Sequence, residues 1–366
     1  MYSVCVVETV TGKYLGPLDC NVDAWSRELN GTDTATVALN PGASTAVTRD
    51  WLRLITTPWR MTLVVQWNGI PVFAGPIISR PFDGKQVKIN AAGVRTAIFG
   101  RRKAHTWVQP YATQVITYTG MSLGSIAQAL AVVGTAAGKG GSAIPIVYPA
   151  TEISSDVTLN RSYKGFELKD ISTLWTELTS VGPDIDFLPG WTDSTQTVLQ
   201  YTMRIGTIAQ PKLQSAGALA FNYSQPASSV KSMSFIEDAS LQATTEWAAG
   251  SGTDVGTTMS MATNTALTLA GWPMLEAQTD YRTITTQSIL DTHTVADLAT
   301  HAGSTFQFGL IVDATQPPSF GSYLLGDVAV VTVRNNIWIP DNDFTMRIVK
   351  MSGNSSTSIT LDMQAA

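Results

Sequence analysis

The sequence predicts a mainly β protein of the α+β class, in which two antiparallel β-domains flank a mixed α/β middle region. Three observations predict it: short segments of alternating apolar and polar residues between glycine turns, helix-type periodicity in only a few segments, and a shortage of charge. Charged residues make up only 14 % of the 366 residues, against roughly 25 % in an ordinary soluble domain. Threonine, serine, glutamine and asparagine take their place, and β-branched threonine suits a pleated, half-exposed surface.

The first β-domain is expected to span residues 1–104. Its clearest strand is Met61–Trp67, where apolar and polar residues alternate, so one face of this strand should be buried. Asn68-Gly69 follows, and both residues tolerate the positive φ that a tight hairpin turn demands. The chain then returns through Val72–Ser79.

A second turn at Asp83-Gly84 leads to a third strand at Val87–Ala91, where apolar and polar residues alternate again. These three segments predict a three-stranded antiparallel meander. Two further strands are predicted upstream, at residues 2–9 and 34–40.

The middle region, residues 105–205, is expected to combine helices and strands. Residues 122–133 predict a helix that begins at Ser122. Residues 166–182 predict a stronger one, because apolar side chains recur at three-and-four spacing and Gly182-Pro183 ends it. Its apolar face comprises Leu168, Ile171, Leu174, Trp175, Leu178 and Val181. A strand is predicted at residues 197–206.

Residues 206–366 are expected to form the second β-domain, which contains a short helix at residues 292–302. Thr292 or Thr294 is the expected N-cap of this helix. Residues 248–258, rich in glycine, threonine and serine, predict a loop. The predicted strands are residues 232–238, 324–334, 344–353 and 355–363.

Charge and targeting signals narrow the function classes. The formal net charge is −5, and the densest basic cluster is Arg101–Lys103, so recognition of a nucleic-acid sequence is not favoured. The N-terminus has no secretion signal, and no apolar run approaches the roughly 20 residues that span a bilayer. We therefore expect assembly in a cytoplasm and no stable membrane insertion. Cys5 and Cys20 are too few for a disulfide framework or a zinc site, and both are expected to be buried or half-buried free thiols.

One motif resembles a catalytic one. Gly120–Gly124 matches G-x-S-x-G with Ser122 as the nucleophile, between a predicted strand and a predicted helix, and Asp291 with His293 or His301 gives the right chain order. However, that motif belongs to a mostly parallel sheet, whereas this chain is dominated by hairpins. The Ser122 hydroxyl has a simpler role as the cap of the helix that follows it. An esterase or cell-wall hydrolase using Ser122 is the enzymatic alternative.

The remaining motifs are weaker. Gly134–Gly141 resembles a phosphate-binding loop, but Lys139 stands where the second glycine should be. The pairs Asp184/Asp186 and Asp341/Asp343 could hold a hard cation, but no further ligands of a calcium loop accompany them, and turn chemistry explains them better. His105, His293 and His301 lack the spacing of a zinc motif. The sequence thus predicts no catalytic residue, no metal and no cofactor. Ten tryptophans, among them Trp191 and Trp272, leave a carbohydrate- or receptor-binding module as a second alternative.

Several segments together resemble a known family. They are the Arg-x-Leu-Asn turn at Arg27–Asn30 with the strand "ATVAL", the hairpin with "NG" and then "FAG" at Phe73–Gly75, and the strand that runs into Arg101-Arg102. The segments "LWTELTSVGPDIDFLPGW", "MRIG", "VADLATHA" and "LLGDVAVVTVR" through "ITLDM" extend the likeness over nearly the whole chain. The sequence resembles siphophage minor tail proteins of the baseplate-hub type, especially those of phages of actinobacteria.

This resemblance implies a structural role. It implies two β-barrel-like hub domains and a homotrimer whose copies form a ring at the tail tip of the virion, assembled in the host cytoplasm. The ring would join the tail tube to a spike or fibres, and its neighbours would be the distal tail protein, the tape-measure protein and other minor tail proteins. DNA would pass through the ring without specific binding during ejection, which agrees with the absence of a strongly basic sequence.

Overall fold

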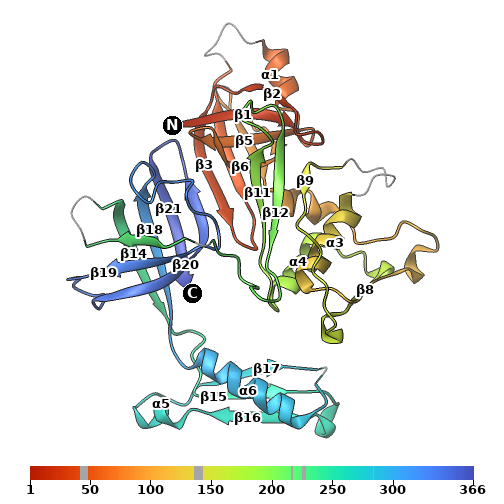
Figure 1. Cartoon of the computed structure of the whole chain (residues 1–366), viewed down its shortest axis with the longest axis vertical. Helices are drawn as coiled ribbons and strands as arrows, with labels where there is room; N and C mark the ends of the chain where they lie inside the picture. The colour runs from red at the N-terminus through yellow and green to blue at the C-terminus, as the bar shows by residue number, and fades with distance from the viewer. Residues whose placement is uncertain (42–47, 136–142, 216, 225–227, 283) are drawn as a thin grey trace. The chain divides into compact units, whose positions relative to one another are not determined.

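The computed structural model describes residues 1–41, 48–135, 143–215, 217–224, 228–282 and 284–366. The chain divides into two compact units (Figure 1): unit 1 comprises Met1–Met233, Gly309–Gln364 and Ala366, and unit 2 comprises Ser234–Phe308 and Ala365. The chain leaves unit 1 within β14 (Val230–Asp238) and returns within β18 (Thr305–Asp313). The two units thus separate at positions other than the borders at 104 and 205, which remain predictions.

In the part of the chain that the structure describes, thirteen strands share one large sheet, in the order β14-β18-β21-β20-β3-β4-β7-β6-β5-β1-β2, with β19 also pairing with β20 and β13 pairing with β19. Among the described residues of this sheet, β1–β5, β5–β6, β4–β7, β3–β4, β3–β20 and β19–β20 are antiparallel pairs, and β13 is parallel to β19. The other strands are β1 (Tyr2–Glu8), β2 (Tyr14–Pro17), β3 (Asn21–Glu28), β4 (Thr34–Leu39), β5 (Met61–Trp67), β6 (Ile70–Ser79), β7 (Val87–Ala92), β13 (Leu219–Asn222), β19 (Val328–Val333), β20 (Asn342–Gly353) and β21 (Ser358–Ala365).

The two ends of the chain build this sheet together. β3 pairs with β20 in antiparallel register, with Arg27 opposite Met351. Within the described ranges the order of strands is an open path that ends at β2 and β14, with no closed barrel. The predicted mainly β, α+β class is confirmed, whereas the expected barrel-like closure is not found among the described residues. A barrel closes only when the first and last strands of its sheet pair. Here those strands are β14 and β2, which lie at opposite ends of the strand order.

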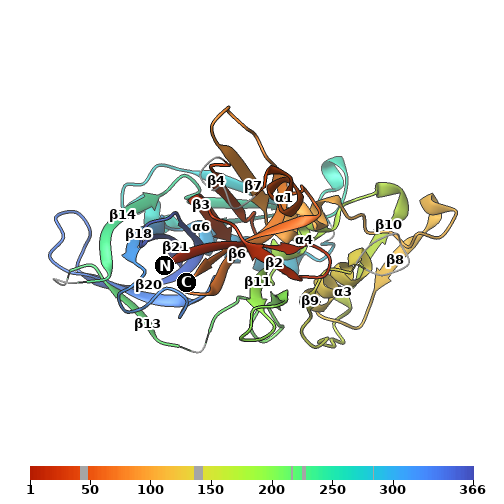
Figure 2. The ribbon, with the colours of Figure 1, turned by 90° about the horizontal axis from the view of Figure 1, so that it is seen from above.

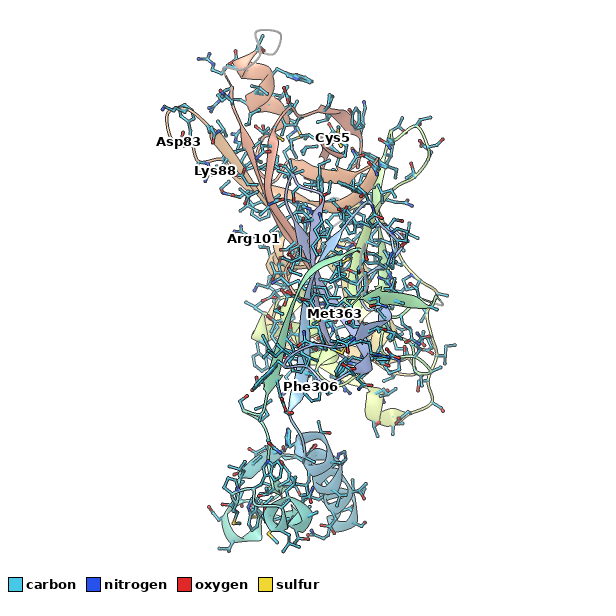
Figure 3. All side chains as sticks on the ribbon, turned by 90° about the vertical axis from the view of Figure 1, so that its left-hand side faces the viewer. Cys5, Asp83, Lys88, Arg101, Phe306 and Met363 are labelled. Atoms are coloured by element: carbon cyan, nitrogen blue, oxygen red, sulfur yellow. The ribbon has the colours of Figure 1, made fainter. Side chains whose placement is uncertain are left out.

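The meander predicted for residues 61–91 is confirmed as β5, β6 and β7. Asn68 and Gly69 adopt φ values of 49° and 81°, as the tight turn requires. The β6–β7 hairpin, which carries Asp83 and Lys88, projects from the sheet (Figure 3). One expectation fails, because all seven residues of β5 are buried rather than one face of it.

The double burial of β5 reflects layers on both sides of the sheet. Val64 belongs to a core cluster that includes the helices of the middle region, whereas Leu63 and Val65, which are also fully buried, point to the opposite face. β11 (Ile185–Trp191) and β12 (Leu199–Ile205) form an antiparallel pair, and β11 contacts β6 (Figure 1).

The middle region has a compact aromatic core. Trp175 is fully buried between Phe99 and Phe187, with ring centroids 4.6 and 5.4 Å away, and its indole Nε1 donates to the carbonyl of Ala127 at 2.9 Å. Two small sheets accompany it: β8 (Val115–Tyr118) with β10 (Arg161–Lys164), and β9 (Ile146–Val147) in parallel with β12. The helices of unit 1 are α1 (Arg49–Ile55), α2 (Val94–Ala97), α3 (Leu123–Thr135) and α4 (Ile171–Thr179), with 3-10 turns at Phe99–Arg101, Tyr111–Thr113, Val157–Leu159 and Gly165–Glu167. In Figure 2, α1 lies near the outer ends of β4 and β7.

The two predicted helices of the middle region are confirmed as α3 and α4, but α4 is shorter than expected. Asp170 caps α4 by accepting the Thr173 N–H at 2.8 Å. Leu168 and Val181, predicted on the buried face, lie outside the helix and are 53 % and 59 % exposed. The apolar periodicity of the sequence extends beyond both ends of the helix. The start of the helix is set by its aspartate cap and not by this periodicity.

Unit 2 is a three-stranded sheet with a helix packed across one face. β15 (Thr245–Ala249) lies between β16 (Met259–Thr263), which is antiparallel to it, and β17 (Glu276–Asp280), which is parallel to it. Helix α6 (Gln287–His301) contacts β15 and β16. A short helix α5 (Thr265–Leu269) and a 3-10 turn (Asp254–Gly256) complete the unit.

Helix α6 confirms the helix predicted at residues 292–302 but not its cap. The helix begins four residues before Asp291, after Thr286. Thr292 and Thr294 lie inside it, where their hydroxyls donate to the carbonyls of Ser288 and Leu290. Interior threonines commonly form such bonds one turn back, so a threonine alone does not mark the start of a helix.

Candidate functional site

Ser122 caps α3. Its Oγ accepts the N–H of Ser125 at 3.2 Å, its carbonyl accepts the N–H of Ile126, and the residue is only 3 % exposed. The capping role is therefore confirmed. A nucleophile must reach solvent and contact a general base, whereas this hydroxyl is buried and engaged with its own helix.

The other members of the hypothetical triad have partners within unit 2. Asp291 accepts hydrogen bonds from Ser260 at 2.6 Å and Gln287 at 2.7 Å. His301 Nδ1 lies 2.9 Å from Glu246, a fully buried carboxylate that also accepts from Thr279. The His293 ring packs on Tyr281 with centroids 4.7 Å apart. These contacts give the triad no geometric support.

Asp184 lies at the centre of a buried polar network in unit 1. Its side chain is 1 % exposed, accepts from Asn30 Nδ2 and the Leu213 N–H at 2.8 Å each, and forms an ion pair with Arg347. Asn30 also accepts the N–H of Ile185 at 2.8 Å. The Asn30 turn, with φ of 58°, is thus tied directly to the start of β11.

Asp186 forms the second half of this network. Its Oδ1 lies 2.6 Å from Arg27 Nη2, and both side chains are 3 % exposed. Its Oδ2 accepts from Arg204 Nη1 at 3.1 Å, and the same nitrogen donates to the carbonyl of Leu325. Arg27 is on β3, Arg204 on β12 and Arg347 on β20. Buried ion pairs therefore join the first, middle and last segments of unit 1.

These arginines are the residues that sequence reasoning missed. The sequence pattern at Asp184/Asp186 indicates a cation site or a turn, and the structure gives both carboxylates guanidinium partners. Arg204 and Arg347 each lie in the same four-residue string, Thr-Met-Arg-Ile. A charged residue between apolar neighbours in a strand, repeated in a chain so poor in charge, was the signal that could have revealed them.

Asp33 lies at the edge of the network. Its Oδ2 is 3.7 Å from Arg27 Nε, and its Oδ1 accepts the N–H of Glu28. Burial raises the pKa of Asp33 to about 7, against the opposing effect of Arg27. Nearby, Arg95 is 7 % exposed and its two terminal nitrogens have no hydrogen-bond partner within the described residues. Burial lowers the pKa of Arg95 to about 10.

The raised pKa of Asp33 makes stability depend on pH. Because the folded state holds this proton more tightly than the unfolded state, the Asp33 contribution to stability falls as pH rises from about 4 to about 7. We expect Asp33→Asn to gain about 1–3 kcal/mol relative to the wild type on going from pH 5 to pH 8. Urea unfolding at both pH values measures this, with Asp50→Asn as the exposed control. Parallel pH profiles for wild type and Asp33→Asn would contradict it.

The second aspartate pair is part of the surface. Asp341 accepts the N–H of Asn335 at 2.6 Å, and Asp343 accepts from Thr332 and from Arg334 Nη2 at 2.7 Å. In the described part of the chain, no three His, Cys, Asp or Glu side chains are grouped so as to hold a metal ion. The glycine loop at Gly134–Gly141 falls largely on residues 136–142, outside the described residues.

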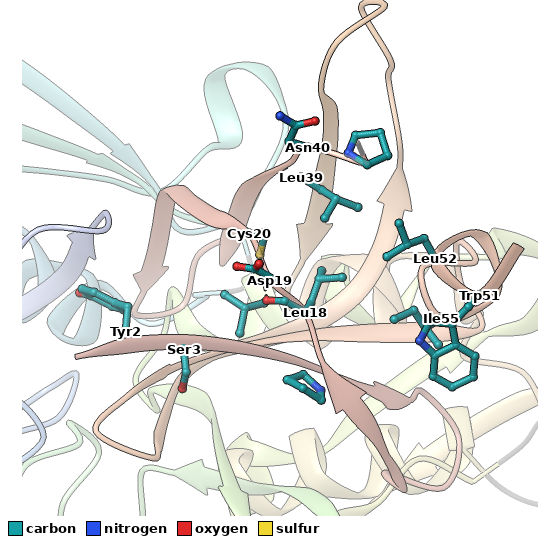
Figure 4. A pocket seen from close by; sticks show the side chains of 13 residues that line it. Tyr2, Ser3, Leu18, Asp19, Cys20, Leu39, Asn40, Trp51, Leu52 and Ile55 are labelled. Carbon is teal, nitrogen blue, oxygen red and sulfur yellow. Dashed lines mark hydrogen bonds between the residues drawn. The ribbon is translucent and has the colours of Figure 1, made fainter. Parts of the chain in front are cut away.

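A pocket of about 440 Å³ opens between β1, β2 and α1 (Figure 4). Its walls are mainly apolar, from Leu18, Leu39, Leu52 and Ile55, with Cys20 among the polar lining. Cys20 is half-buried and Cys5 is buried, and both are free thiols as predicted. The pocket thus offers an apolar hollow rather than an array of reactive groups.

Both thiols are expected to be unreactive in the folded protein. Burial raises the pKa of Cys5 to about 12, and burial together with Asp19 and Asp23 raises that of Cys20 to about 12. The thiolate is the reactive species, so Ellman's reagent at pH 8 should label neither cysteine until urea unfolds the chain. Rapid labelling of one cysteine in the native protein would contradict the described packing.

The tryptophans differ in exposure. Trp25, Trp67 and Trp175 are buried in the core. Trp272 and Trp338 are 45 % and 82 % exposed. Among the described residues, no ring contact joins two exposed tryptophans. Exposed and adjacent rings would have favoured sugar stacking, so nothing here supports that alternative. No helix among the described residues has the length and apolar character to cross a membrane.

Comparisons of the whole chain with known proteins find likeness in structure and not in sequence. No family model and no curated protein sequence matches. The 43 kDa tail protein of prophage MuSo2 from Shewanella oneidensis matches with a TM-score of 0.59 and 10 % identity, over 99 % of this chain and 98 % of that one. The tail protein from Neisseria meningitidis MC58 matches with a TM-score of 0.56 and 12 % identity, over 99 % and 96 %.

A third structure extends this group. The prophage tail protein gp18 from Listeria monocytogenes EGD-e matches with a TM-score of 0.52 and 11 % identity, over 100 % of this chain and 94 % of that one. All three likenesses run nearly from end to end in both chains. Along almost its entire length, this chain therefore has the fold of phage tail proteins.

Proposed function

We propose that this protein is a structural subunit of a phage tail tip, of the baseplate-hub type, and that it carries out no reaction. The observation that carries the proposal is the end-to-end likeness to three tail proteins, two of them from prophages, which includes both compact units rather than one common domain. The sequence resemblance to minor tail proteins of siphophages of actinobacteria points the same way.

In this proposal three copies form a ring that joins the tail tube to a spike or fibres. The distal tail protein, the tape-measure protein and other minor tail proteins are its neighbours, and DNA passes through without specific binding. The buried ion pairs favour a rigid unit 1, because they join β3, β11, β12 and β20. Rigidity suits a subunit that must hold its position in a symmetric assembly.

A phage in which a stop codon interrupts the gene for this protein tests the proposal. We expect particles with absent or arrested tails and no infectivity, and a plasmid copy of the intact gene should restore both. Electron microscopy of the particles is the measurement. Normal tails and normal infectivity in the absence of the protein would overturn the proposal.

The enzymatic alternative has its own test in the Ser122→Ala variant. Because Ser122 caps α3, its loss should lower the stability of the protein by about 1 kcal/mol without changing any rate. Hydrolysis of a p-nitrophenyl ester by the wild type that disappears in Ser122→Ala would contradict a purely structural role, whereas equal background rates agree with it.

A further inference from the structure

A groove of about 630 Å³ lies beside α1 in unit 1. Three guanidinium groups line it, from Arg49, Arg53 and Arg80, and its apolar walls include Leu39, Leu52 and Phe82. Arg49 is 84 % exposed and Phe82 is 61 % exposed. Leu39 and Leu52 also line the pocket of Figure 4, so the two hollows adjoin across these side chains and form one apolar surface with a basic side.

The groove lies within a part of the sequence that has more basic than acidic residues. Residues 49–103 contain ten basic residues and only two acidic ones, Asp50 and Asp83. Asp83 is engaged in its own turn, where it accepts the N–H groups of Lys85 and Gln86. Asp50 forms an ion pair with Arg49 that is fully open to solvent. Of the three arginines that line the groove, Arg49 alone forms an ion pair within the described residues, whereas Arg80 donates to the Arg53 carbonyl and to Thr56.

Unit 2 has the opposite charge. Residues 234–308 contain eight acidic residues and one basic residue, Arg282, which gives this unit a net charge of −7. The remainder of the chain, with 22 basic and 20 acidic residues, is weakly positive. Such an asymmetry between two parts of one chain indicates a role in association.

The face of the unit 2 sheet opposite α6 combines this charge with apolar side chains. In the strand register, Trp247 lies between Met261 and Gln278, and Ala249 lies between Met259 and Asp280. Met259 and Met261 are 52 % and 55 % exposed, and Glu276 lies at the β17 edge of the same face. The face therefore has an apolar centre and an acidic edge.

We propose that the groove beside α1 binds the acidic sheet face of unit 2 from a second copy of this chain. The inference rests on the proposed function, because it names the two surfaces that join neighbouring copies in the ring. The two surfaces carry charges of opposite sign, and each combines charge with exposed apolar area. A contact between two different surfaces is heterologous, and repetition of a heterologous contact closes a ring when the rotation allows it.

The apolar part of the groove favours a protein over a nucleic acid as its occupant. Phosphate backbones are held mainly by Lys and Arg with polar side chains, whereas Leu39, Leu52 and the exposed Phe82 offer area that a phosphate does not use. The acidic edge at Glu276 and Asp280 supplies carboxylates, which guanidinium groups bind well. Within their own unit, Asp280 pairs with Arg282 at 3.0 Å and Glu276 accepts from Trp247 Nε1 at 2.9 Å, and both contacts lie at the surface.

The experiment uses full-length chains with charge reversals on one surface at a time. The groove variant is Arg49→Glu with Arg53→Glu, and the face variant is Glu276→Lys with Asp280→Lys. All four side chains are exposed, so folding should be preserved, and circular dichroism with thermal unfolding verifies this. Lys13→Glu and Asp254→Lys, exposed residues outside the two surfaces, are the matched controls.

We expect each variant alone to be monomeric in sedimentation velocity up to about 100 µM. At this concentration even a weak intact interface would still give complexes. An equal mixture of the two should give a heterodimer or a larger mixed complex, because the intact face of the groove variant meets the intact groove of the face variant, and the two reversed surfaces also carry opposite charges. The variant that carries all four reversals should self-associate like the wild type. So should each of the two control variants. Raising NaCl from 0.05 to 0.5 M should weaken the mixed complex severalfold.

Absence of any mixed complex, or a groove variant that self-associates as well as the wild type, overturns the inference. So does binding of a fluorescent DNA duplex by the wild type that the groove variant loses, because the groove would then be a phosphate site. The stop-codon experiment is independent of these outcomes: particles that need the protein for their tails while its groove variant still assembles would overturn only the inference.

Discussion

Asp186→Ala is expected to lower the free energy of unfolding of unit 1 by about 3–5 kcal/mol. The substitution removes the carboxylate that lies 2.6 Å from Arg27 and 3.1 Å from Arg204. Arg27 is then left with a buried charge whose remaining carboxylate neighbour is Asp33, at 3.7 Å. An unpaired charge in a medium of low dielectric constant is the main cost. Urea unfolding followed by tryptophan fluorescence measures it.

Two further variants test whether the loss comes from the buried charge. Asp50→Ala removes one partner of the exposed Arg49–Asp50 pair and should change stability by less than about 1 kcal/mol. Arg27→Met combined with Asp186→Leu should recover part of the loss, because the most buried charge of the network is then removed together with its carboxylate. Arg204, which is 15 % exposed, keeps its hydrogen bond to the Leu325 carbonyl. If Asp186→Ala costs no more than Asp50→Ala, the network is solvated and does not hold unit 1 together.

Trp175→Ala is the second substitution with a large expected effect, a loss of about 3–5 kcal/mol. The indole is fully buried between Phe99 and Phe187, and its removal leaves a cavity where α4 packs on α3. The hydrogen bond from Nε1 to the Ala127 carbonyl is lost as well. Thermal unfolding with detection of helical circular dichroism is the measurement.

Trp338→Ala is the matched control, since that side chain is 82 % exposed and its removal should change stability by at most about 0.5 kcal/mol. Trp175→Phe keeps an aromatic ring and should cost less than the alanine variant. Equal stability of Trp175→Ala and the wild type would show that α3 and α4 do not depend on this ring.

Local signals predicted the local elements well. The meander from Met61 to Ala92 follows from alternation and from residues that accept positive φ, and both are properties of a few neighbouring residues. Helix α3 with its Ser122 cap is of the same kind. Helix α6 was found, but its start was not, because threonine hydroxyls form the same kind of bond inside a helix as before it.

Contacts between distant residues could not be predicted in this way. The pairing of β3 with β20 depends on both strands having a free edge in the folded chain, and no pattern within either strand records this. The burial of both faces of β5 depends on layers contributed by other segments. Asp184 and Asp186 were noticed as a pair, but their partners lie on strands far away in sequence.

The shared sheet has a consequence for the order of events during synthesis. β3 leaves the ribosome early, whereas its neighbour β20 is made about 320 residues later, roughly 16–65 s at common translation rates. During that interval the N-terminal sheet has an open edge, and in a cell making many copies at once it can pair with the nascent chain of a neighbouring ribosome. The supply of chaperones that shield this edge until translation ends would therefore set how much correctly folded protein a cell produces.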